Sequence, residues 1–481
     1  MSPDEPQLKQ ELEQLRDFML QTQKQHSYLL EKVYPSQYLS AINLLHYLAL
    51  RSIDIRPLQD ALHQLGLSSL MNAESHIYSQ MLLVLKHFNT NSDEYPLTYT
   101  NSKILLQQRS NFLFGNTASV PAIMVTLKTS HASDTLAVVK LLKAGMQIAR
   151  INCAHDDEKT WLQMVQKIQL AMELTALPCK IYMDLAGPKV RTKIKGKKCR
   201  IRLHSGDHFY LSDEKIPPDD LPVVACTITG MASQLKPGER VFFDDGVIET
   251  KVFAIENNTA RLEVVRLPDE KTFLKEAKGI NFPDSHFSLS AFTGFDRECL
   301  PFILKYADMV GYSFIHNTTD LVELQAGMKE KNLPIILKIE TPEAFKNFPA
   351  LLFKAMEQEY FGVMIARGDL AVELGFERMS EVQEEICWIC EAAHAPVIWA
   401  TQVLETMNKK GIATRSEITD AFYSHMAECI MINKGAHTVQ VIKALRNILD
   451  RSGGHHLKKR YLFRPLNVAR NFLTGKNNRF L

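Results

Sequence analysis

The chain has 481 residues, 46% of them apolar, a length that suits about two to four domains and a composition that can give each a buried core. The formal net charge of +2 gives no electrostatic reason to expect a nucleic acid or a membrane surface as a partner. Eight cysteines are too sparse for a disulfide scaffold, Met1 to Glu5 is too polar for a signal peptide, and no apolar run reaches the roughly 18 residues of a membrane span, so we expect a cytoplasmic protein.

The N-terminal part of the chain is expected to be helical. Its apolar residues recur at the spacing of a helix face, and Pro35 and residues 89–101 interrupt this pattern. It contains no cluster of side chains with an evident chemical role, so we expect it to serve packing or assembly. The expected helices are residues 7–32, 38–51, 55–65 and 73–87.

From Pro121 onward, short apolar strands alternate with helical segments, and eight such strands follow one another. A closed barrel accounts for eight strands in βα order better than an open sheet does. The expected fold class is therefore α/β, with a (β/α)₈ or TIM barrel. The expected strands are residues 123–126, 147–151, 180–184, 308–314, 335–339, 362–366, 397–401 and 429–432.

The alternation stops between Lys193 and Pro283, where short β-like runs are separated by turn signals. We expect an all-β domain inserted into the barrel as a lid. Within it, residues 244–246 (Asp-Asp-Gly) are either a hairpin turn or a tip that closes over a nucleotide. The expected domains are a helical N-terminal region (1–115), the barrel (116–192 and 284–452), the lid (193–283) and a C-terminal tail (453–481).

Chemically useful side chains follow three neighbouring strands of the expected barrel. Lys338 and Glu340 are two residues apart, so both emerge on the same side of a strand. Gly368 and Asp369 follow the next strand, and Thr401 ends the one after it. Because the C-terminal ends of barrel strands meet at one face, these groups are expected to share one pocket.

The donor atoms of this pocket indicate a hard metal ion. Glu340 and Asp369 offer oxygen ligands, which suit Mg²⁺ (or Mn²⁺) better than Zn²⁺. Lys338 beside such an ion can neutralise a transferring phosphoryl group or a developing enolate. Any one of these residues alone is an ordinary ion-pairing or capping residue, and only their convergence favours an active site.

Six ordered segments between Pro121 and Asp450 resemble the pyruvate kinase family. The resemblance implies a phosphotransferase of glycolysis that uses Mg²⁺ to move a phosphoryl group from phosphoenolpyruvate to ADP, which gives pyruvate and ATP. The family's barrel carries an all-β lid after its third strand, where the alternation stops here. The segments are residues 145–152, 183–192, 278–283, 336–340, 364–370 and 397–407.

The resemblance also implies roles for single residues. Glu340 and Asp369 would hold the divalent metal, and Lys338 would stabilise the phosphoryl group in transfer. Arg150 would bind the phosphate of the substrate. Gly368 and Thr401, with Asp369, would bind its carboxylate region, and Thr401 is expected to be catalytic together with Lys338 and Arg150. The residues assigned to the nucleotide side are Arg191, Lys278 and His155.

The monovalent-cation site of the family is altered. Asn152 and Asp184 match its ligands, but Ala154 replaces a serine, and Leu185 replaces a threonine of which only the backbone carbonyl would remain useful. Lys189 stands where potassium-dependent members carry glutamate, and a lysine there accompanies potassium independence. We therefore expect that K⁺ is not required.

Other departures concern the nucleotide side and the ends of the chain. Residues 128–130 differ from the family's Gly-Pro, Ala186 replaces a lysine, and residues 432–435 (Ile-Asn-Lys-Gly) replace Ser-Gly-Glu-Thr. The chain ends soon after Asp450, so we expect neither the family's C-terminal regulatory domain nor activation by sugar phosphates through it. The helical N-terminal region is similar to extensions in a divergent bacterial branch of pyruvate-kinase-like proteins.

Two other functions stay open from the sequence. A lyase of the related Mg²⁺–enolate barrels, such as a 2-oxo-acid aldolase, shares the metal carboxylates but does not account for the lid, Arg191 or Lys278. A non-catalytic sensor of phosphoenolpyruvate, signalling through residues 1–110, would fit the altered nucleotide-side loops. The sequence does not set the oligomeric state, and a homo-oligomer is one option.

Overall fold

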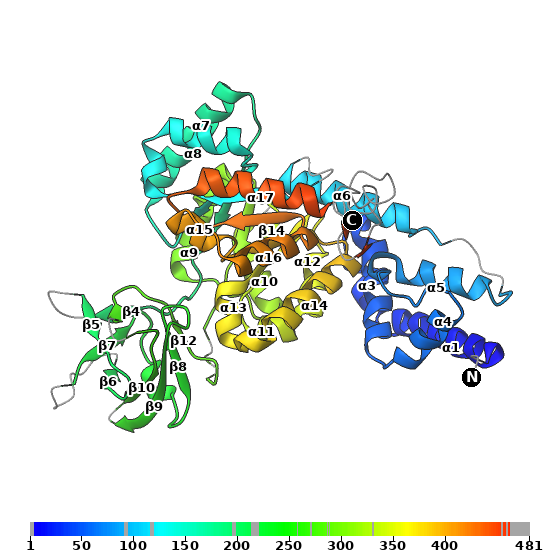
Figure 1. Ribbon diagram of the computed structural model, residues 1–481, viewed down its shortest axis with the longest axis horizontal. Helices are drawn as coiled ribbons and strands as arrows, with labels where there is room; N and C mark the ends of the chain where they lie inside the picture. Colours follow the sequence, from blue (N-terminus) through cyan, green and yellow to red (C-terminus); the bar gives the residue numbers. More distant parts are fainter. Residues whose placement is uncertain are drawn as a thin grey trace, which may run out of the picture.

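The protein is a closed barrel of eight parallel strands, with a β-sheet insertion on one side and a helical N-terminal region on the other (Figure 1). The expected α/β class, barrel, inserted sheet and helical N-terminal region are thus confirmed. The expected domain boundaries stay a prediction, and most of the expected tail lies outside the described residues. The computed structural model describes residues 4–90, 95–115, 120–194, 199–212, 221–256, 258–269, 272–285, 287, 289–329, 331–453, 456–457 and 460–461.

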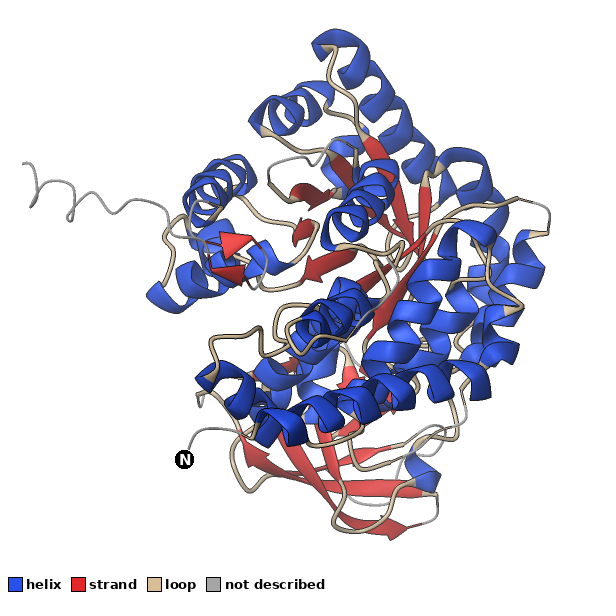
Figure 2. Ribbon diagram, turned by 90° about the vertical axis from the view of Figure 1, so that its right-hand side faces the viewer, coloured by secondary structure: helices blue, strands red, loops and turns tan. Residues whose placement is uncertain are grey.

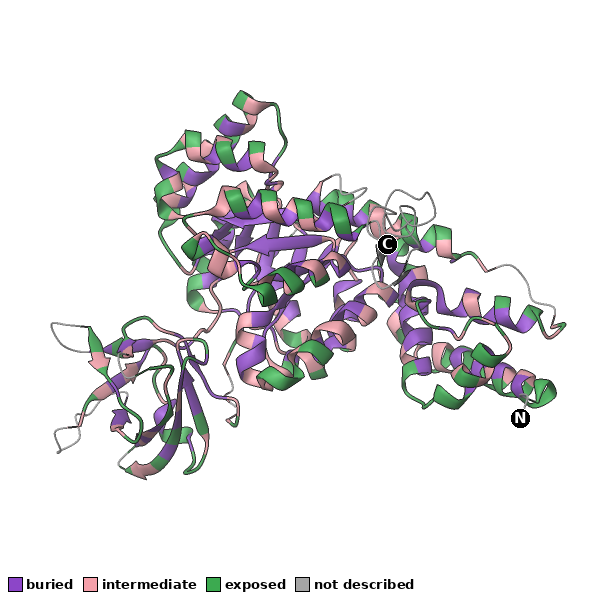
Figure 3. Ribbon diagram, in the orientation of Figure 1, coloured by how far each residue is buried: buried purple, intermediate pink, exposed green. Residues whose placement is uncertain are grey.

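The barrel strands are almost completely buried, as the central ribbons of Figure 3 show. Successive side chains of a strand point to opposite faces, so one set fills the barrel and the other packs under the helices. Met124, Ile148, Tyr182, Met364 and Ile398 belong to the inner set. The strands, in their spatial order, are β1 (Ala122–Thr126), β17 (Cys429–Ile432), β16 (Val397–Ala400), β15 (Phe361–Ala366), β14 (Ile335–Ile339), β13 (Met309–Tyr312), β3 (Lys180–Asp184) and β2 (Ile148–Asn152).

Helices cover the outside of the barrel (Figure 2). Two short helices, α13 and α15, begin soon after the ends of β15 and β16. α13 begins at Arg367, directly where β15 ends, so Gly368 and Asp369 lie in its first turn. The helices after β1 are α7 (Thr135–Ala144), α8 (Glu158–Thr175), α9 (Gly294–Tyr306), α10 (Thr318–Met328), α11 (Pro342–Lys346), α12 (Phe348–Ala355), α13 (Arg367–Leu374), α14 (Met379–Ala392), α15 (Glu405–Lys410), α16 (Arg415–Tyr423) and α17 (Thr438–Ser452), with 3₁₀ turns η3 (Thr129–Ala132), η5 (Phe376–Arg378) and η6 (Ser424–Met426).

The inserted sheet, called the lid below, follows β3 and has a core of its own around Phe209, Phe243 and Leu262. Residues 244–246 form the turn between β8 and β9, so the hairpin interpretation is correct. The spatial order of the main sheet is β12-β8-β9-β10-β6-β7-β4, beside a β11-β5 pair. The elements are β4 (Thr192–Ile194), β5 (Arg200–Arg202), β6 (His208–Leu211), β7 (Val223–Cys226), η4 (Ala232–Gln234), β8 (Arg240–Phe243), β9 (Ile248–Glu256), β10 (Thr259–Arg266), β11 (Phe273–Lys275) and β12 (Ile280–Asn281).

The N-terminal region packs on the end of the barrel opposite to the C-terminal ends of the strands. Asn43 Nδ2 donates to Ala392 O at 2.8 Å, and the ring of His394, in the loop before β16, contacts Ser40 Oγ and Ser75 O. The fully buried polar side chains of Asn43 and His394 therefore join the two parts. The helices are α1 (Glu5–Gln25), α2 (Ser27–Leu30), η1 (Pro35–Gln37), α3 (Tyr38–Arg51), α4 (Arg56–Gln64), η2 (Glu74–His76), α5 (Ile77–Lys86) and α6 (Tyr99–Phe114), and a small hairpin of β18 (His456–Leu457) and β19 (Arg460–Tyr461) follows α17.

Helix α6 was not expected, because its buried face carries polar side chains and no apolar stripe. Ser102, Arg109 and Ser110 are buried along it together with Leu113 and Phe114. The expected helix 7–32 is also divided, into α1 and α2, at His26. No helix in the described parts of the chain is long and apolar enough to cross a membrane.

Candidate active site

A cavity of about 580 Å³ opens at the C-terminal ends of the barrel strands, between the barrel and the lid. Two residues with predicted roles do not line it: Asp184 is fully buried and contacts Lys338 and Arg150, and His155 lies in the loop after β2. The residues with predicted roles that line the cavity are Arg150, Asn152, Lys189, Arg191, Lys278, Lys338, Glu340, Gly368, Asp369 and Thr401.

Lys338 lies at the centre of a buried polar network. Its Nζ is 2.6 Å from Ser313 Oγ, 3.0 Å from Glu340 Oε1 and 3.6 Å from Asp184 Oδ1, and the residue is 7% exposed. The two-residue spacing of Lys338 and Glu340 predicts their contact, since both side chains leave β14 on one face. The ammonium group therefore lies at the cavity wall with a carboxylate on either side of it.

Glu340 is held in a fixed orientation at the end of β14. Its Oε2 accepts a hydrogen bond of 2.6 Å from the backbone N–H of Phe314, a residue in the left-handed region with φ of 54°. Burial raises the pKa of Glu340, the positive charge of Lys338 opposes this, and the negative charge of Asp369 raises the pKa further. The two carboxylates thus lie close enough to repel each other, which a cation between them would relieve.

Arg150 and Asp184 form a second buried network that the sequence revealed only in part. Arg150 Nε donates to Asp184 Oδ2 at 2.7 Å and Nη1 to Thr126 Oγ1 at 2.9 Å, while Tyr182 OH donates to Asp184 Oδ1 at 2.5 Å. Burial opposes ionisation, yet the charges of Lys338 and Arg150 hold the pKa of Asp184 below its ordinary value. The spacing of Tyr182 and Asp184, two residues along β3, was the available signal for that pair.

Lys189 joins the barrel to the lid. Its Nζ is 2.7 Å from Asp369 Oδ1 and 3.4 Å from Asp245 Oδ1 in the β8–β9 turn. Burial lowers the pKa of Lys189, and the charges of Asp369 and Asp245 more than compensate, so the net pKa is raised. Beside it, Lys278 Nζ is 2.8 Å from Asp244 Oδ1. The turn 244–246 is therefore a hairpin whose two carboxylates also line the cavity.

The loop after β16 is held in an unusual backbone conformation. Thr401 and Gln402 have φ angles of 64° and 56°, a backbone region that residues other than glycine rarely adopt. Thr401 Oγ1 accepts a hydrogen bond of 2.8 Å from the N–H of Gly368. Arg367 fixes the same loop, because its Nη2 donates to Thr401 O at 2.6 Å while its guanidinium pairs with Asp420. Arg367 is thus a positioning residue to which the sequence reasoning assigned no role.

The wall of the cavity offers oxygen donors for a divalent metal. In the described residues, no group of three or more His, Cys, Asp or Glu side chains is arranged to hold a metal. Glu340 and Asp369 supply two carboxylates at one wall of the cavity, and both now face lysines. Two oxygen donors fit Mg²⁺, which keeps several waters and shares its shell with substrate phosphates, better than Zn²⁺.

Glu373 on α13 connects the barrel to the lid and titrates near neutrality. Asn281 Nδ2 of β12 donates to Glu373 Oε1 at 2.8 Å. Burial raises the pKa of Glu373 from 4.5 to about 7, against the effect of this hydrogen bond. The pKa of Glu373 is higher in the folded protein than in the unfolded chain. Its contribution to stability is therefore fully present below the unfolded pKa and is lost as the pH rises to about 7.

Glu373→Gln should remove this pH dependence, since glutamine imitates the protonated acid. Between pH 5 and pH 8, we expect the free energy of unfolding of the variant to rise by about 1–3 kcal/mol relative to that of the wild type. Urea unfolding of both proteins at the two pH values measures the gain. If the two proteins differ in free energy of unfolding by the same amount at pH 5 and at pH 8, the titration of Glu373 is contradicted.

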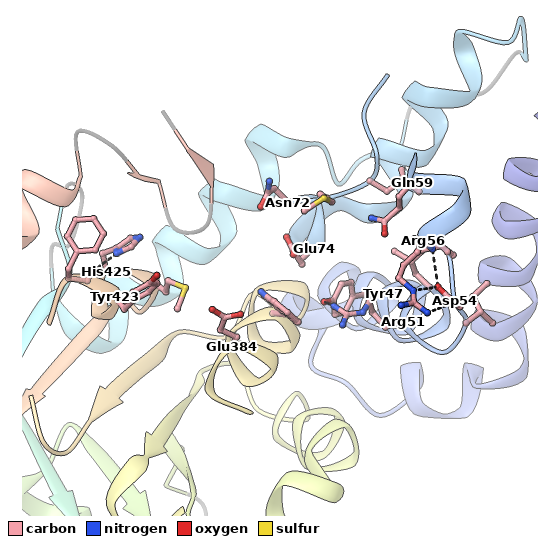
Figure 4. A pocket seen from close by; sticks show the side chains of 18 residues that line it. Tyr47, Arg51, Asp54, Arg56, Gln59, Asn72, Glu74, Glu384, Tyr423 and His425 are labelled. Atoms are coloured by element: carbon pink, nitrogen blue, oxygen red, sulfur yellow. Dashed lines mark hydrogen bonds and ion pairs between the residues drawn. The ribbon is translucent and has the colours of Figure 1, made fainter. Parts of the chain in front are cut away.

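A second cavity, of about 830 Å³, lies between the N-terminal region and the barrel (Figure 4). Arg51 stacks over the ring of Trp388, with its Cζ 4.8 Å from the ring centroid, and donates to Tyr47 OH at 2.8 Å. Arg56 pairs with Asp54, and both residues line the cavity. This cavity lies at the end of the barrel opposite to Lys338 and shares no residue with the first one.

Comparisons with known proteins agree with the geometry of the first cavity. The family model described as "Pyruvate kinase, barrel domain" matches residues 120–439. A pyruvate kinase of Dictyostelium discoideum is 31% identical over 303 residues, and one of Thermococcus litoralis is 32% identical over 289 residues. These matches cover 62% and 59% of this chain and 58% of each relative.

A cytosolic isozyme of pyruvate kinase from Solanum tuberosum is 28% identical over 348 residues, which cover 69% of this chain and 66% of the relative. The chain therefore spans less than two thirds of the length of the curated relatives it matches. The family model alone covers more than half of the chain, and it includes β1 to β17 with the lid. The resemblance seen in the six segments is confirmed, and the chain belongs to the pyruvate kinase family.

Proposed function

We propose that the protein transfers a phosphoryl group from phosphoenolpyruvate to ADP. The observation that supports this most directly is the placement of Lys338 between Glu340 and Asp184 at the wall of a cavity that Asp369 and Thr401 also line. In the reaction, the bond between phosphorus and the enol oxygen breaks while a bond to a terminal oxygen of ADP forms. The released enolate then takes up a proton at carbon and becomes pyruvate.

Glu340 and Asp369 are the residues that would hold the divalent metal. Bound Mg²⁺ supplies charge neutralisation for phosphoryl oxygens during transfer. Phe314 N–H and Lys338 orient Glu340, and Lys189 orients Asp369, so both carboxylates are positioned before substrate binds. Such preorganisation lowers the cost of reorganisation during the reaction.

Phosphoenolpyruvate would be held by groups that the fold fixes independently. Arg150, anchored by Asp184 and Thr126, would present its guanidinium to the phosphate. The first turn of α13, with Gly368 and Asp369, and Thr401 would face its carboxylate region; Gly368 N–H donates to Thr401 Oγ1. Lys338 would neutralise the charge on the phosphoryl group as it moves. In-line transfer needs this positioning and neutralisation more than covalent help from the protein.

ADP would enter from the lid side of the cavity. Arg191 and Lys278 line this side. Burial lowers the pKa of His155, and the positive charges of Lys434 and Arg191 lower it further.

A coupled assay with phosphoenolpyruvate, ADP and Mg²⁺ tests the proposal. We expect pyruvate and ATP to form in equal amounts, and turnover at the buffer background would contradict the proposal. Pyruvate release from hydroxy-oxo acids without nucleotide would instead indicate the lyase. Tight binding of phosphoenolpyruvate without turnover, together with a partner bound by residues 1–110, would indicate the sensor.

Activity is expected to be independent of K⁺. The ammonium group of Lys189, paired with Asp369 and Asp245, would supply the positive charge that a monovalent cation supplies in other members. We expect kcat to change by less than about twofold when K⁺ replaces a tetraalkylammonium ion at equal ionic strength. Such a change corresponds to less than about 1 kcal/mol in the activation free energy. Lys189→Glu should create K⁺ dependence. A wild-type enzyme inactive without K⁺ would contradict the role of Lys189.

The cellular location is also a proposal. The Solanum tuberosum relative is described as a cytosolic isozyme, and the composition of this chain favours a cytoplasmic protein with reduced thiols. Fractionation of cells that express the chain with a small tag measures this, and recovery mainly with membranes would contradict it.

A further inference from the structure

The second cavity, between the N-terminal region and the barrel, lies partly outside the range that the family model matches (Figure 4). Residues between Tyr47 and Glu74 form one side of it, ahead of the matched residues 120–439. Helix α14, the end of α16 and η6 supply the other side. The proposed phosphoryl transfer gives this cavity no role, so its own side chains must indicate what it binds.

Arg51, the exposed last residue of α3, brings to this cavity a positive charge that no carboxylate cancels. Its Nη1 donates to Tyr47 OH at 2.8 Å, and its Cζ lies 4.8 Å from the ring centroid of Trp388. Among the described residues, no carboxylate lies within 4.0 Å of its guanidinium, and its other N–H groups have no acceptor.

The contacts of Arg51 fix its guanidinium without neutralising it. Burial raises the pKa of Tyr47, against the charge of Arg51, so the phenol that accepts from Arg51 stays uncharged. The ring of Trp388 holds the planar guanidinium from one side. A guanidinium fixed in this way can offer two parallel N–H groups to a carboxylate, which is the arrangement that arginine favours.

The other charged side chains of the cavity limit the charge that a ligand can carry. Arg56 and Asp54 neutralise each other through two contacts, of 2.9 and 2.6 Å. Glu74 and Glu384 also line the cavity, and Glu384 makes no hydrogen bond or ion pair with a described residue. Two carboxylates near a single available arginine disfavour a dianion such as a phosphate ester and leave room for one negative charge.

Large apolar side chains around the cavity are open to contact. Ile53, Met71 and Tyr423 are 46%, 65% and 48% exposed, and all three line it together with Trp388 and Phe422. Exposed apolar groups that gather on one concave surface indicate a binding site for an apolar body. A volume of about 830 Å³ is typical of cavities that hold small organic molecules.

We propose that this cavity binds a small organic monoanion, a carboxylate with an apolar body, whose carboxylate pairs with the guanidinium of Arg51. The apolar body lies against Met71, Trp388 and Tyr423. Because such a ligand contacts both the N-terminal region and α14, its binding holds these two parts of the protein together. The site is independent of the proposed phosphoryl transfer, since the two cavities share no residue.

Equilibrium dialysis of the whole protein with 4-phenylbutanoate and with its neutral amide, 4-phenylbutanamide, tests the site. We expect the wild type to bind the carboxylate roughly 10-fold more tightly than the amide, because only the carboxylate forms charge-assisted hydrogen bonds with Arg51. Arg51→Gln should remove this preference. Glu384→Gln should strengthen binding of the carboxylate severalfold, because a negative charge is lost from the wall. Inorganic phosphate at equal ionic strength should not displace the carboxylate.

Arg297→Gln is the matched control for Arg51→Gln. Arg297 is also exposed and also stacks on an aromatic ring, with its Cζ 4.4 Å from the ring centroid of Phe292, but it does not line the cavity. This variant should bind 4-phenylbutanoate as the wild type does. A loss of affinity equal to that of Arg51→Gln would overturn the pairing with Arg51.

The fluorescence of Trp388 shows whether the ligand occupies this cavity. Trp388 is partly exposed, whereas Trp161 and Trp399, the other two tryptophans, are 1% and 0% exposed. Acrylamide quenching of the tryptophan fluorescence should therefore decrease when 4-phenylbutanoate binds to the wild type. At the same ligand concentration, quenching in Arg51→Gln should decrease much less.

Several results would overturn the site. They are an absence of binding by the wild type, equal affinities for the carboxylate and the amide, and binding that leaves the acrylamide quenching unchanged. Displacement of the carboxylate by inorganic phosphate, or weaker binding in Glu384→Gln, would contradict the preference for an apolar monoanion. None of these results bears on phosphoryl transfer, which the coupled assay measures separately.

Discussion

Replacing Lys338 with methionine is expected to lower kcat for phosphoryl transfer by about 10²–10³-fold or more, because the lost ammonium group would no longer offset the charge that develops in the transition state. The length of the side chain is nearly kept, so the cavity wall should change little. Affinity for phosphoenolpyruvate should fall much less than kcat, since Arg150 and Thr401 would still hold the substrate. Steady-state kinetics in the coupled assay separate kcat from KM.

Two controls make the result on Lys338 interpretable. Lys305→Met, an exposed lysine on α9, should leave the kinetics unchanged. Lys338→Met also leaves Glu340 and Asp184 without their shared cation, so thermal unfolding must show that the variant is folded. A folded variant with the kcat of the wild type would exclude Lys338 from catalysis.

Replacing Arg109 with methionine is expected to destabilise the protein by about 3–5 kcal/mol, since buried polar partners would lose their donor. Its Nη1 donates to Ala393 O and His394 O at 3.1 and 3.0 Å, and its Nη2 to Ser36 O and Ser40 Oγ at 3.0 Å each. Burial lowers the pKa of Arg109 to about 10. Arg109 thus joins α6, the start of α3 and the loop before β16.

Urea unfolding measures the effect of the Arg109 substitution. Gln108→Ala, at an exposed position of the same helix, should cost less than about 0.5 kcal/mol. Limited proteolysis should also cut the N-terminal region earlier in the Arg109 variant, because its attachment to the barrel is weakened. A loss no larger than that of the Gln108 variant would show that the apolar contacts of the region suffice without this network.

The sequence by itself determined the barrel and the placement of its reactive side chains. Eight apolar strands in βα order are a local pattern, and a period of two along β14 puts Lys338 and Glu340 on one face. The shared end of parallel strands then brings Asp369 and Thr401 to the same cavity. Their roles in catalysis stay a prediction.

Only the tertiary structure decided which groups pair over long separations in the chain. Lys189 contacts Asp369, 180 residues further on, and Arg109 contacts the loop before β16. The sequence around Lys189 or Arg109 does not predict either partner. Helix α6 was missed for the same reason, since polar groups form its buried face. Periodicity reports whether a side chain is apolar and where it points, whereas the partner of a buried charge is fixed by the packing of whole elements.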